Sequence, residues 1–332
     1  MKKPKILQIL SMYHPEGERI LADGAEVIWT DNIETVNLCK LAADAEGIVL
    51  RAPARITREI IDAAPKLRAI SGAGVGLDNI DVAYATSKGI PVLHAPSVNA
   101  ASTAEHAVML IMALGKNLVP FHEEMSSGNY GARTLLKSYE LKGKKAGIVG
   151  FGSIAKETAK RLKLGLGMDV SAWVRRYDEK KHGMAKDWGI TITDDLESIF
   201  RESDFISLHI PLNEQTRGLV GKEKLALMKP TSYLINTARG GIVNQTDLYN
   251  ALKGGEIAGA ALDVFDPEPP KADDPILSLP NVIVTPHIGG TTVECNYIMS
   301  TTVAKNILKA VNGGKPDFVG NPEVFNEKGG VK

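Results

Sequence analysis

Short runs of aliphatic and β-branched residues alternate with helical patterns along almost the whole chain, and no other sequence feature constrains the fold as much. Neighbouring parallel strands need a crossover connection of a dozen or more residues, usually a helix. A repeating strand–helix order therefore predicts an α/β fold with parallel sheets. The length of 332 residues favours two domains, each large enough to bury its own core.

A first series of strands and helices opens the chain. The predicted strands are 6–10, 26–29, 47–50, 67–71 and 91–94, with helices such as 34–43 and 57–64 between them. This series predicts a flavodoxin-like, doubly wound sheet. A long apolar helix over 101–115 follows, which Ser102 or Thr103 is expected to cap.

A second series then supplies six further strands. They are 145–149, 169–174, 204–210, 232–236, 258–264 and 282–285. Six strands with intervening helices match a complete Rossmann sheet. Because a last helix over 292–311 follows this series, we expect the chain to cross between the domains twice. The predicted architecture is α/β with two doubly wound parallel-sheet domains: a Rossmann dinucleotide-binding domain over 100–289, inserted into a flavodoxin-like substrate domain formed by 1–99 and 290–332.

A glycine-rich turn follows the first strand of the second series, with the pattern Gly150-x-Gly152-x-x-Ala155. Gly150 permits a tight turn, Gly152 lets the backbone approach a pyrophosphate, and the helix N-terminus holds its negative charge. The pattern alone also fits an ordinary turn between a strand and a helix. The strand before it, the helix after it and the further strand–helix units favour a dinucleotide site.

The end of the next strand distinguishes NAD from NADP. NAD enzymes usually place an Asp or Glu there to bind the adenosine ribose. Here Val174 occupies the expected acid position, and Arg175 and Arg176 follow it. Guanidinium groups bind phosphate well, which favours NADP over NAD. The alternative is that both arginines are solvated loop residues and Asp178 supplies the acid.

Charge and cysteine content exclude several other classes of protein. Basic and acidic residues balance at 39 each, which argues against nucleic-acid and membrane-surface partners. Cys39 and Cys295 are too few for a disulfide scaffold or a structural zinc site, so no metal site is expected. No apolar stretch approaches the roughly 20 residues of a membrane span, and no signal peptide is evident. We expect a cytoplasmic protein.

Three segments beyond strand ends of the second series carry groups suited to catalysis. They are 236–241 with Arg239, 262–269 with Glu268, and 284–290 with His287. Ligands of open α/β sheets bind at the carboxyl ends of the strands, so a cation, a carboxylate and an imidazole are expected to converge there. Each residue alone also fits an ordinary solvated loop.

Together these groups suit hydride transfer to a carbonyl. Histidine donates the proton that the carbonyl oxygen needs, and a nearby carboxylate favours the protonated imidazole and orients it. An arginine can hold a substrate carboxylate at two points.

These motifs resemble the D-isomer-specific 2-hydroxyacid dehydrogenase family. The resemblance covers nearly the whole chain, including 72–81, 209–212, 236–241, 263–269 and 286–290. It implies an NAD(P)-dependent enzyme in which Arg239, Glu268 and His287 are catalytic and Asp263 receives the nicotinamide amide. The remaining cofactor contacts that it implies are Gly150, Gly152, Ser153, Ile154, Ile210, Pro211, Thr237 and Gly289.

The same resemblance implies a small 2-oxo or 2-hydroxy acid as substrate. The backbone of Ala73, Gly74, Val75 and Gly76 matches the family's substrate-binding loop, and Arg51 matches the substrate-contacting arginine of phosphoglycerate dehydrogenases. Arg51, Arg55 and Arg239 together suit a small dianion. Arg51 as a solvated strand end is the alternative.

A homodimer is also expected. The helix 101–115 and the stretch to residue 139 contain Phe121, Tyr130, Leu135 and Leu136, and this region wraps around a second subunit in the resembling family. Two other functions stay open on the same fold. One is a nucleotide-sensing binding protein similar to transcriptional corepressors. The other is a formate or phosphite dehydrogenase relative.

Overall fold

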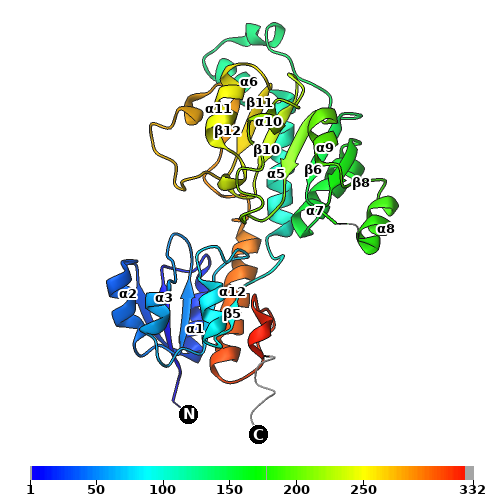
Figure 1. The fold of residues 1–332 in the computed structure, drawn as a ribbon. Helices are drawn as coiled ribbons and strands as arrows, with labels where there is room; N and C mark the ends of the chain where they lie inside the picture. The colour runs from blue at the N-terminus through cyan, green and yellow to red at the C-terminus, as the bar shows by residue number, and fades with distance from the viewer. Residues whose placement is uncertain (1, 177, 326–332) are drawn as a thin grey trace. The chain divides into compact units, whose positions relative to one another are not determined.

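A computed structural model describes residues 2–176 and 178–325. The described residues up to Asn99, together with those from Thr291 onward, form one compact unit. Residues Ala100–Gly290 form the second unit (Figure 1). Gly290 therefore lies in the second unit, one residue beyond the expected boundary.

The first unit contains a parallel sheet with the strand order β2-β1-β3-β4-β5. This is the order of flavodoxin-like sheets, so the predicted fold class is confirmed for this unit. Its described strands are β1 (Lys5–Ile9), β2 (Glu26–Thr30), β3 (Gly47–Leu50), β4 (Ala69–Gly72) and β5 (Val92–Leu93). Its described helices are α1 (Pro15–Gly24), α2 (Thr35–Ala42), α3 (Arg58–Asp62), α4 (Val82–Ser87), α12 (Val293–Val311) and the short 3-10 helix η5 (Pro322–Phe325).

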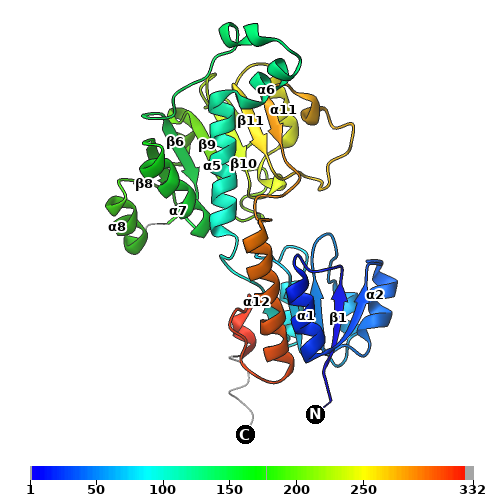
Figure 2. The ribbon, with the colours of Figure 1, turned by 180° about the vertical axis from the view of Figure 1, so that it is seen from behind.

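Helices cover both faces of this first sheet. Because successive strand residues point to opposite faces, Ile48 packs toward α2 and α3 while Val49 packs toward α1 and α12. Helices α1 and α12 lie side by side in both ribbon views (Figure 2). The core of this unit therefore depends on a helix that comes from the far end of the sequence.

The second unit contains a parallel sheet with the order β12-β11-β10-β9-β6-β7-β8. The order reverses direction between β6 and β9, as in Rossmann folds, which confirms the predicted fold class. Among the described residues this sheet has seven strands rather than the predicted six, because β8 was missed. The strands are β6 (Lys145–Val149), β7 (Asp169–Trp173), β8 (Thr191–Thr193), β9 (Phe205–Leu208), β10 (Tyr233–Asn236), β11 (Gly259–Leu262) and β12 (Val282–Val284).

Two apolar clusters fill the two faces of this second sheet. One holds residues of α5 and α7, and the other holds residues of α9, α10 and α11. The described α-helices are α5 (Ala100–Lys116), α6 (Leu118–Ser126), α7 (Ser153–Lys160), α8 (Glu179–Asp187), α9 (Leu196–Glu202), α10 (Lys222–Leu225) and α11 (Gln245–Lys253). Shorter turns of helix are η1 (Tyr130–Thr134), η2 (Arg161–Gly165), η3 (Gly240–Ile242) and η4 (Pro275–Ser278).

Helix α5 corrects one prediction. It begins at Ala100, so Ser102 and Thr103 lie inside its first turn and neither is the residue before the helix. Thr103 is buried instead. Over the described residues, no helix combines the length and apolar character that crossing a bilayer requires.

Candidate active site

The glycine-rich turn lies where β6 ends and α7 begins. Gly150 has φ +103°, which favours glycine, and a Cβ there would lie 2.6 Å from the carbonyl oxygen of His209. At Gly152, by contrast, a Cβ would meet nothing within 4 Å. The turn thus needs glycine at Gly150 for internal packing and leaves open space at Gly152.

The chain after β9 lies against this turn, at the point where the strand order reverses. His209 is half-buried there, and its Nε2 lies 2.9 Å from Ser207 Oγ. Burial lowers the pKa of His209 from 6.5 to about 4, so its imidazole is neutral at pH 7. Ile210 and Pro211, two predicted cofactor contacts, follow directly. The structure therefore places them beside the glycine-rich turn.

His287 and Glu268 meet beyond the ends of β12 and β11. The distance from His287 Nδ1 to Glu268 Oε1 is 2.8 Å, a hydrogen bond across 19 residues of sequence. Both side chains stay accessible, at 48% and 37% exposure. A carboxylate only accepts hydrogen bonds, so Nδ1 carries the hydrogen and Nε2 is left to face a ligand.

The backbone at His287 is held in an uncommon conformation. Its φ of +54° lies in the left-handed region, which costs a non-glycine residue about 1–3 kcal/mol. The amide of His287 donates to the carbonyl oxygen of Asp263 at 2.8 Å. The Asp263 carboxylate accepts from the amides of Ile288 and Gly289, both at 2.9 Å. Asp263 therefore fixes the loop that carries His287.

Asp263 is itself surrounded by donors. Its side chain is 1% exposed and accepts a hydrogen bond from Thr285 Oγ1 at 2.6 Å. His106 of α5 places its Nε2 3.4 Å from the carboxylate and 3.0 Å from Thr285 Oγ1. Burial alone would raise the pKa of Asp263, but hydrogen bonds from His106, Thr285 and the two loop amides outweigh burial and hold that pKa below its ordinary value.

The sequence did not single out His106 or Thr285. His106 lies in a strongly apolar helix, where a histidine is usually a packed core residue. The only indication in the nearby sequence is that His106 follows Thr103 by three residues. This spacing places the two side chains on one face of the helix.

Arg239 lies in the loop after β10. Contacts with Asn236 and with the loop after β11 hold this loop in place. The Asn236 side chain accepts from the Ala238 amide at 3.1 Å and donates to the Arg239 carbonyl at 3.0 Å. A Cβ at Gly240 would lie 1.9 Å from the carbonyl oxygen of Phe265. Only glycine therefore lets the arginine loop approach the loop after β11 that leads to Glu268.

Several groups in the second unit fit a dinucleotide. Gly152 leaves room for a pyrophosphate at the N-terminus of α7, where Ser153 and Ile154 begin the helix. Thr237 Oγ1 is buried without a hydrogen-bond partner among the described residues, and a bound ligand could satisfy it. Asp263 Oδ2 accepts from Gly289, and a carboxylate oxygen can accept a second hydrogen bond.

The end of β7 bears on the choice between NAD and NADP. Val174 is 7% exposed, while Arg175 and Arg176 are exposed. Arg175 donates to the Gln215 side chain from the loop after β9. The Asp178 carboxylate caps α8 by accepting from the Lys181 amide at 2.9 Å, and this hydrogen bond lowers the pKa of Asp178.

In the first unit, Arg51 follows β3. It donates to the Ser11 carbonyl at 2.7 Å and stacks over the Tyr13 ring, 5.4 Å from its centroid. Arg55 instead lines a surface hollow formed by residues 55–59 and 78–81, to which Arg51 does not contribute.

The loop 73–76 follows β4 in the same unit. The Ala73 amide donates to the Leu50 carbonyl at 2.7 Å, which ties the loop to the end of β3. The carbonyl of Val75 lies 3.1 Å from His94 Nδ1. A Cβ at Gly74 would meet nothing within 4 Å, so the backbone there is open to a ligand.

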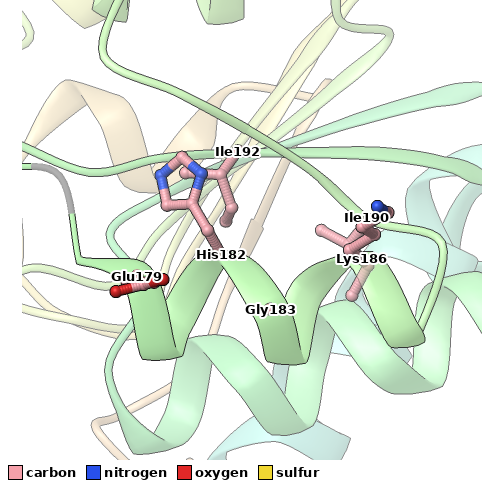
Figure 3. Close-up of a pocket in the computed structure, with 6 residues that line it drawn as sticks. All are labelled: Glu179, His182, Gly183, Lys186, Ile190 and Ile192. Carbon is pink, nitrogen blue, oxygen red and sulfur yellow. The ribbon is translucent and has the colours of Figure 1, made fainter.

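A hollow of about 360 Å³ lies in the second unit, between α8 and the chain at β8. Figure 3 shows His182 of α8 turned toward Ile192, with Lys186 beside Ile190. Among the described residues, no group of three or more His, Cys, Asp or Glu side chains is arranged to hold a metal ion.

Comparisons with known proteins agree on one family. Residues 108–289 match the family described as D-isomer specific 2-hydroxyacid dehydrogenase, NAD binding domain. The chain is 39% identical to a D-3-phosphoglycerate dehydrogenase of Methanocaldococcus jannaschii, over 95% of this chain and 59% of that protein. It thus spans about three-fifths of the length of that relative.

Two further proteins match over nearly their full lengths. A hydroxypyruvate reductase of Thermotoga maritima is 38% identical over 89% of this chain and 94% of its own length. A solved NADPH-dependent glyoxylate/hydroxypyruvate reductase of Sinorhizobium meliloti, in complex with NADP and malonate, superposes with a TM-score of 0.86 at 26% identity. That match covers 96% of this chain and 97% of the other.

Proposed function

The chain belongs to the D-isomer-specific 2-hydroxyacid dehydrogenase family, and from that premise we propose that it transfers hydride reversibly between a nicotinamide dinucleotide and a small 2-oxo or 2-hydroxy acid. The observation that carries the proposal is the hydrogen bond of 2.8 Å between His287 and Glu268 beyond the ends of β12 and β11. The unit that carries this pair also contains the glycine-rich turn.

In the proposed reaction, His287 is the acid and base. Its Nε2 donates a proton to the carbonyl oxygen as hydride reaches the carbonyl carbon, and the 2-oxo acid becomes a 2-hydroxy acid. In the reverse direction Nε2 takes the hydroxyl proton. Glu268 holds Nδ1 and thereby fixes the ring and stabilises its charged form. Arg239 binds the substrate carboxylate at two points.

The cofactor would lie on the second unit. A bound nicotinamide supplies or accepts the hydride. Gly150, Gly152 and the first turn of α7, with Ser153 and Ile154, would hold the pyrophosphate. The remaining contacts are proposed along the ends of β9 to β12, from Ile210, Pro211, Thr237, Asp263 and Gly289, with Asp263 accepting from the nicotinamide amide.

We propose NADP(H) as the preferred cofactor. The buried Val174 offers no carboxylate to repel a 2′-phosphate, and Arg175 and Arg176 are exposed beside it. The rival acid, Asp178, already caps α8. The NADP complex of the Sinorhizobium relative supports the same choice.

The first unit would supply substrate contacts through Arg51 and the backbone of 73–76. Arg51 already lies against Tyr13 and Ser11, so its position is fixed before a ligand binds. A fixed guanidinium favours an acid with a second anionic group, such as a phosphate, sulfonate or second carboxylate.

A homodimer is proposed from the apolar surface of the α5–η1 region. Leu118 is 58%, Tyr130 66% and Leu135 75% exposed, whereas Phe121 and Leu136 are half-buried. Large exposed apolar side chains gathered in one region mark association surfaces. Light scattering at micromolar concentration should give twice the mass of one chain, and a single-chain mass would contradict the proposal.

The decisive experiment is a steady-state assay with NADPH and NADH on glyoxylate, hydroxypyruvate, phosphohydroxypyruvate and sulfopyruvate. We expect turnover of at least one acid, with the highest kcat/KM for one that carries a second anion. Binding of cofactor without turnover of any acid would favour the nucleotide-sensing alternative. Oxidation of formate or phosphite in place of 2-hydroxy acids would favour the other relative on this fold.

A further inference from the structure

We propose that His106, on α5, is a positioning residue that holds the catalytic loop of His287 through Thr285 and Asp263. The inference rests on the proposed role of His287 as acid and base. It starts from the left-handed φ of +54° at His287, a conformation that persists only where neighbouring groups impose it.

The groups that impose this conformation converge on one residue, Asp263. Asp263 accepts the amides of Ile288 and Gly289 with its side chain and the amide of His287 with its backbone carbonyl. The orientation of this carboxylate therefore sets the path of the loop from residue 287 to 289. The side chain is 1% exposed, so water does not replace a lost donor.

The hydrogen positions in the network follow from the number of protons available. Thr285 Oγ1 has one proton, and it lies 2.6 Å from the Asp263 carboxylate, which only accepts. The hydroxyl must therefore accept from its other close neighbour, His106 Nε2, at 3.0 Å. Nε2 thus carries a hydrogen, and it points at Thr285 Oγ1 with Asp263 Oδ1 3.4 Å away.

His106 also connects the loop of His287 to a rigid element of the second unit. It lies in a helix of 17 residues that packs against the sheet near β10 and β11. The network thereby joins a stable helix to an exposed loop that carries no regular structure of its own. A part-buried contact between sequence positions 179 residues apart has this effect without touching substrate.

Paired substitutions test the proposal. His106→Leu and Thr285→Val remove the donor or the hydroxyl and keep the approximate volume, whereas His106→Gln and Thr285→Ser keep a polar group. In the first pair we expect kcat to fall about 10- to 100-fold, since a misplaced catalytic group costs up to about 100-fold. The second pair should stay close to wild type.

Amide hydrogen exchange supplies a readout that does not depend on activity. His106→Leu and Thr285→Val should speed exchange at residues 287–289 and leave the strands of the second sheet protected. His182→Leu, in the α8 hollow, is the matched control and should change neither kcat nor exchange at 287–289.

The outcomes separate this inference from the proposed function. Wild-type protein that reduces no 2-oxo acid would defeat the proposed function, and the exchange measurement would still decide whether His106 holds the loop. Unchanged exchange at 287–289 and unchanged kcat in His106→Leu would overturn the inference. Faster exchange throughout the second sheet would also overturn it, because that result indicates a general structural role.

Discussion

The two parallel sheets follow the same construction, yet their carboxyl ends carry different kinds of groups. In the second unit, the loop of His287 is fixed by the carboxylate of Asp263, which is 1% exposed. In the first unit, the corresponding edge offers the backbone of 73–76 and Arg51, which lies over the Tyr13 ring. Proton transfer depends on placement to about an ångström, whereas Arg51 is proposed to contribute one charge contact to substrate binding. The comparison predicts larger effects for the catalytic groups proposed in the second unit than for Arg51 in the first.

The largest effect is expected for His287→Ala. Removing a general acid and base should lower kcat about 10²- to 10⁴-fold. Cofactor binding should survive, because His287 is proposed to face substrate. Nicotinamide fluorescence titration and steady-state rates measure the two effects, with His182→Ala as control. Near-normal reduction by the variant would refute the catalytic assignment.

Arg239→Lys and Arg51→Lys compare the two edges directly. Lysine keeps the charge but cannot grip a carboxylate at two points. Loss of one such contact, at roughly 1.5–3 kcal/mol, should lower kcat/KM about 10- to 100-fold for Arg239→Lys. Arg51→Lys should mainly raise KM, and more for phosphohydroxypyruvate than for glyoxylate. An equal rise in KM for both acids would mean that Arg51 does not bind a second anionic group of the substrate.

Lowering the pH should reduce the folding stability of the second unit, because His209 resists protonation in the folded state. Its folded pKa is about 4, against 6.5 for an ordinary histidine. Below pH 6.5 the unfolded chain takes up a proton that the folded chain refuses, so stability falls as the pH drops toward 4. The loss at pH 5 should be roughly 2 kcal/mol.

Hydrogen exchange at pH 7 and pH 5, corrected for intrinsic rates, should detect that loss in the second sheet. His209→Gln should flatten the dependence while retaining a polar group near Ser207. A pH dependence that persists unchanged in this variant would assign the effect to other groups.

The smallest effect is expected at the exposed end of β7. One contact of Arg175 with a 2′-phosphate should favour NADPH over NADH by about tenfold, since solvent weakens the interaction. Arg175→Ala should reduce the ratio of kcat/KM for the two cofactors by that factor. A wild type that prefers NADH would instead make Asp178 the candidate ribose ligand.

The sequence predicted both sheets because each strand is a run of apolar residues bounded by turn signals. It missed β8, since Thr191-Ile192-Thr193 is too short to show a period. It also placed the start of α5 late, because Ser102 and Thr103 look like caps when their surroundings are unknown.

The residues of the candidate site likewise divide into those that the sequence predicts and those that only the fold brings together. Arg239, Glu268 and His287 were predicted because each follows a strand end, and the structure pairs Glu268 with His287. His106 was not, because its partners Thr285 and Asp263 lie more than 150 residues away and only the packed fold brings them together. Arg55 was grouped with Arg51 as a contact for a small dianion, and in the structure Arg55 lines a hollow of residues 55–59 and 78–81.

Insertion of one unit within the other has a consequence for synthesis on the ribosome. Helix α12 supplies Met299, Val303 and Ile307 to the core of the first unit, but it is translated only after Ala100–Gly290. At 5–20 residues per second, those roughly 190 residues take about 10–40 s. Throughout that interval the nascent first sheet lacks the cover of α12 on one apolar face. The chain is therefore most prone to aggregate, and most in need of a chaperone, before α12 emerges.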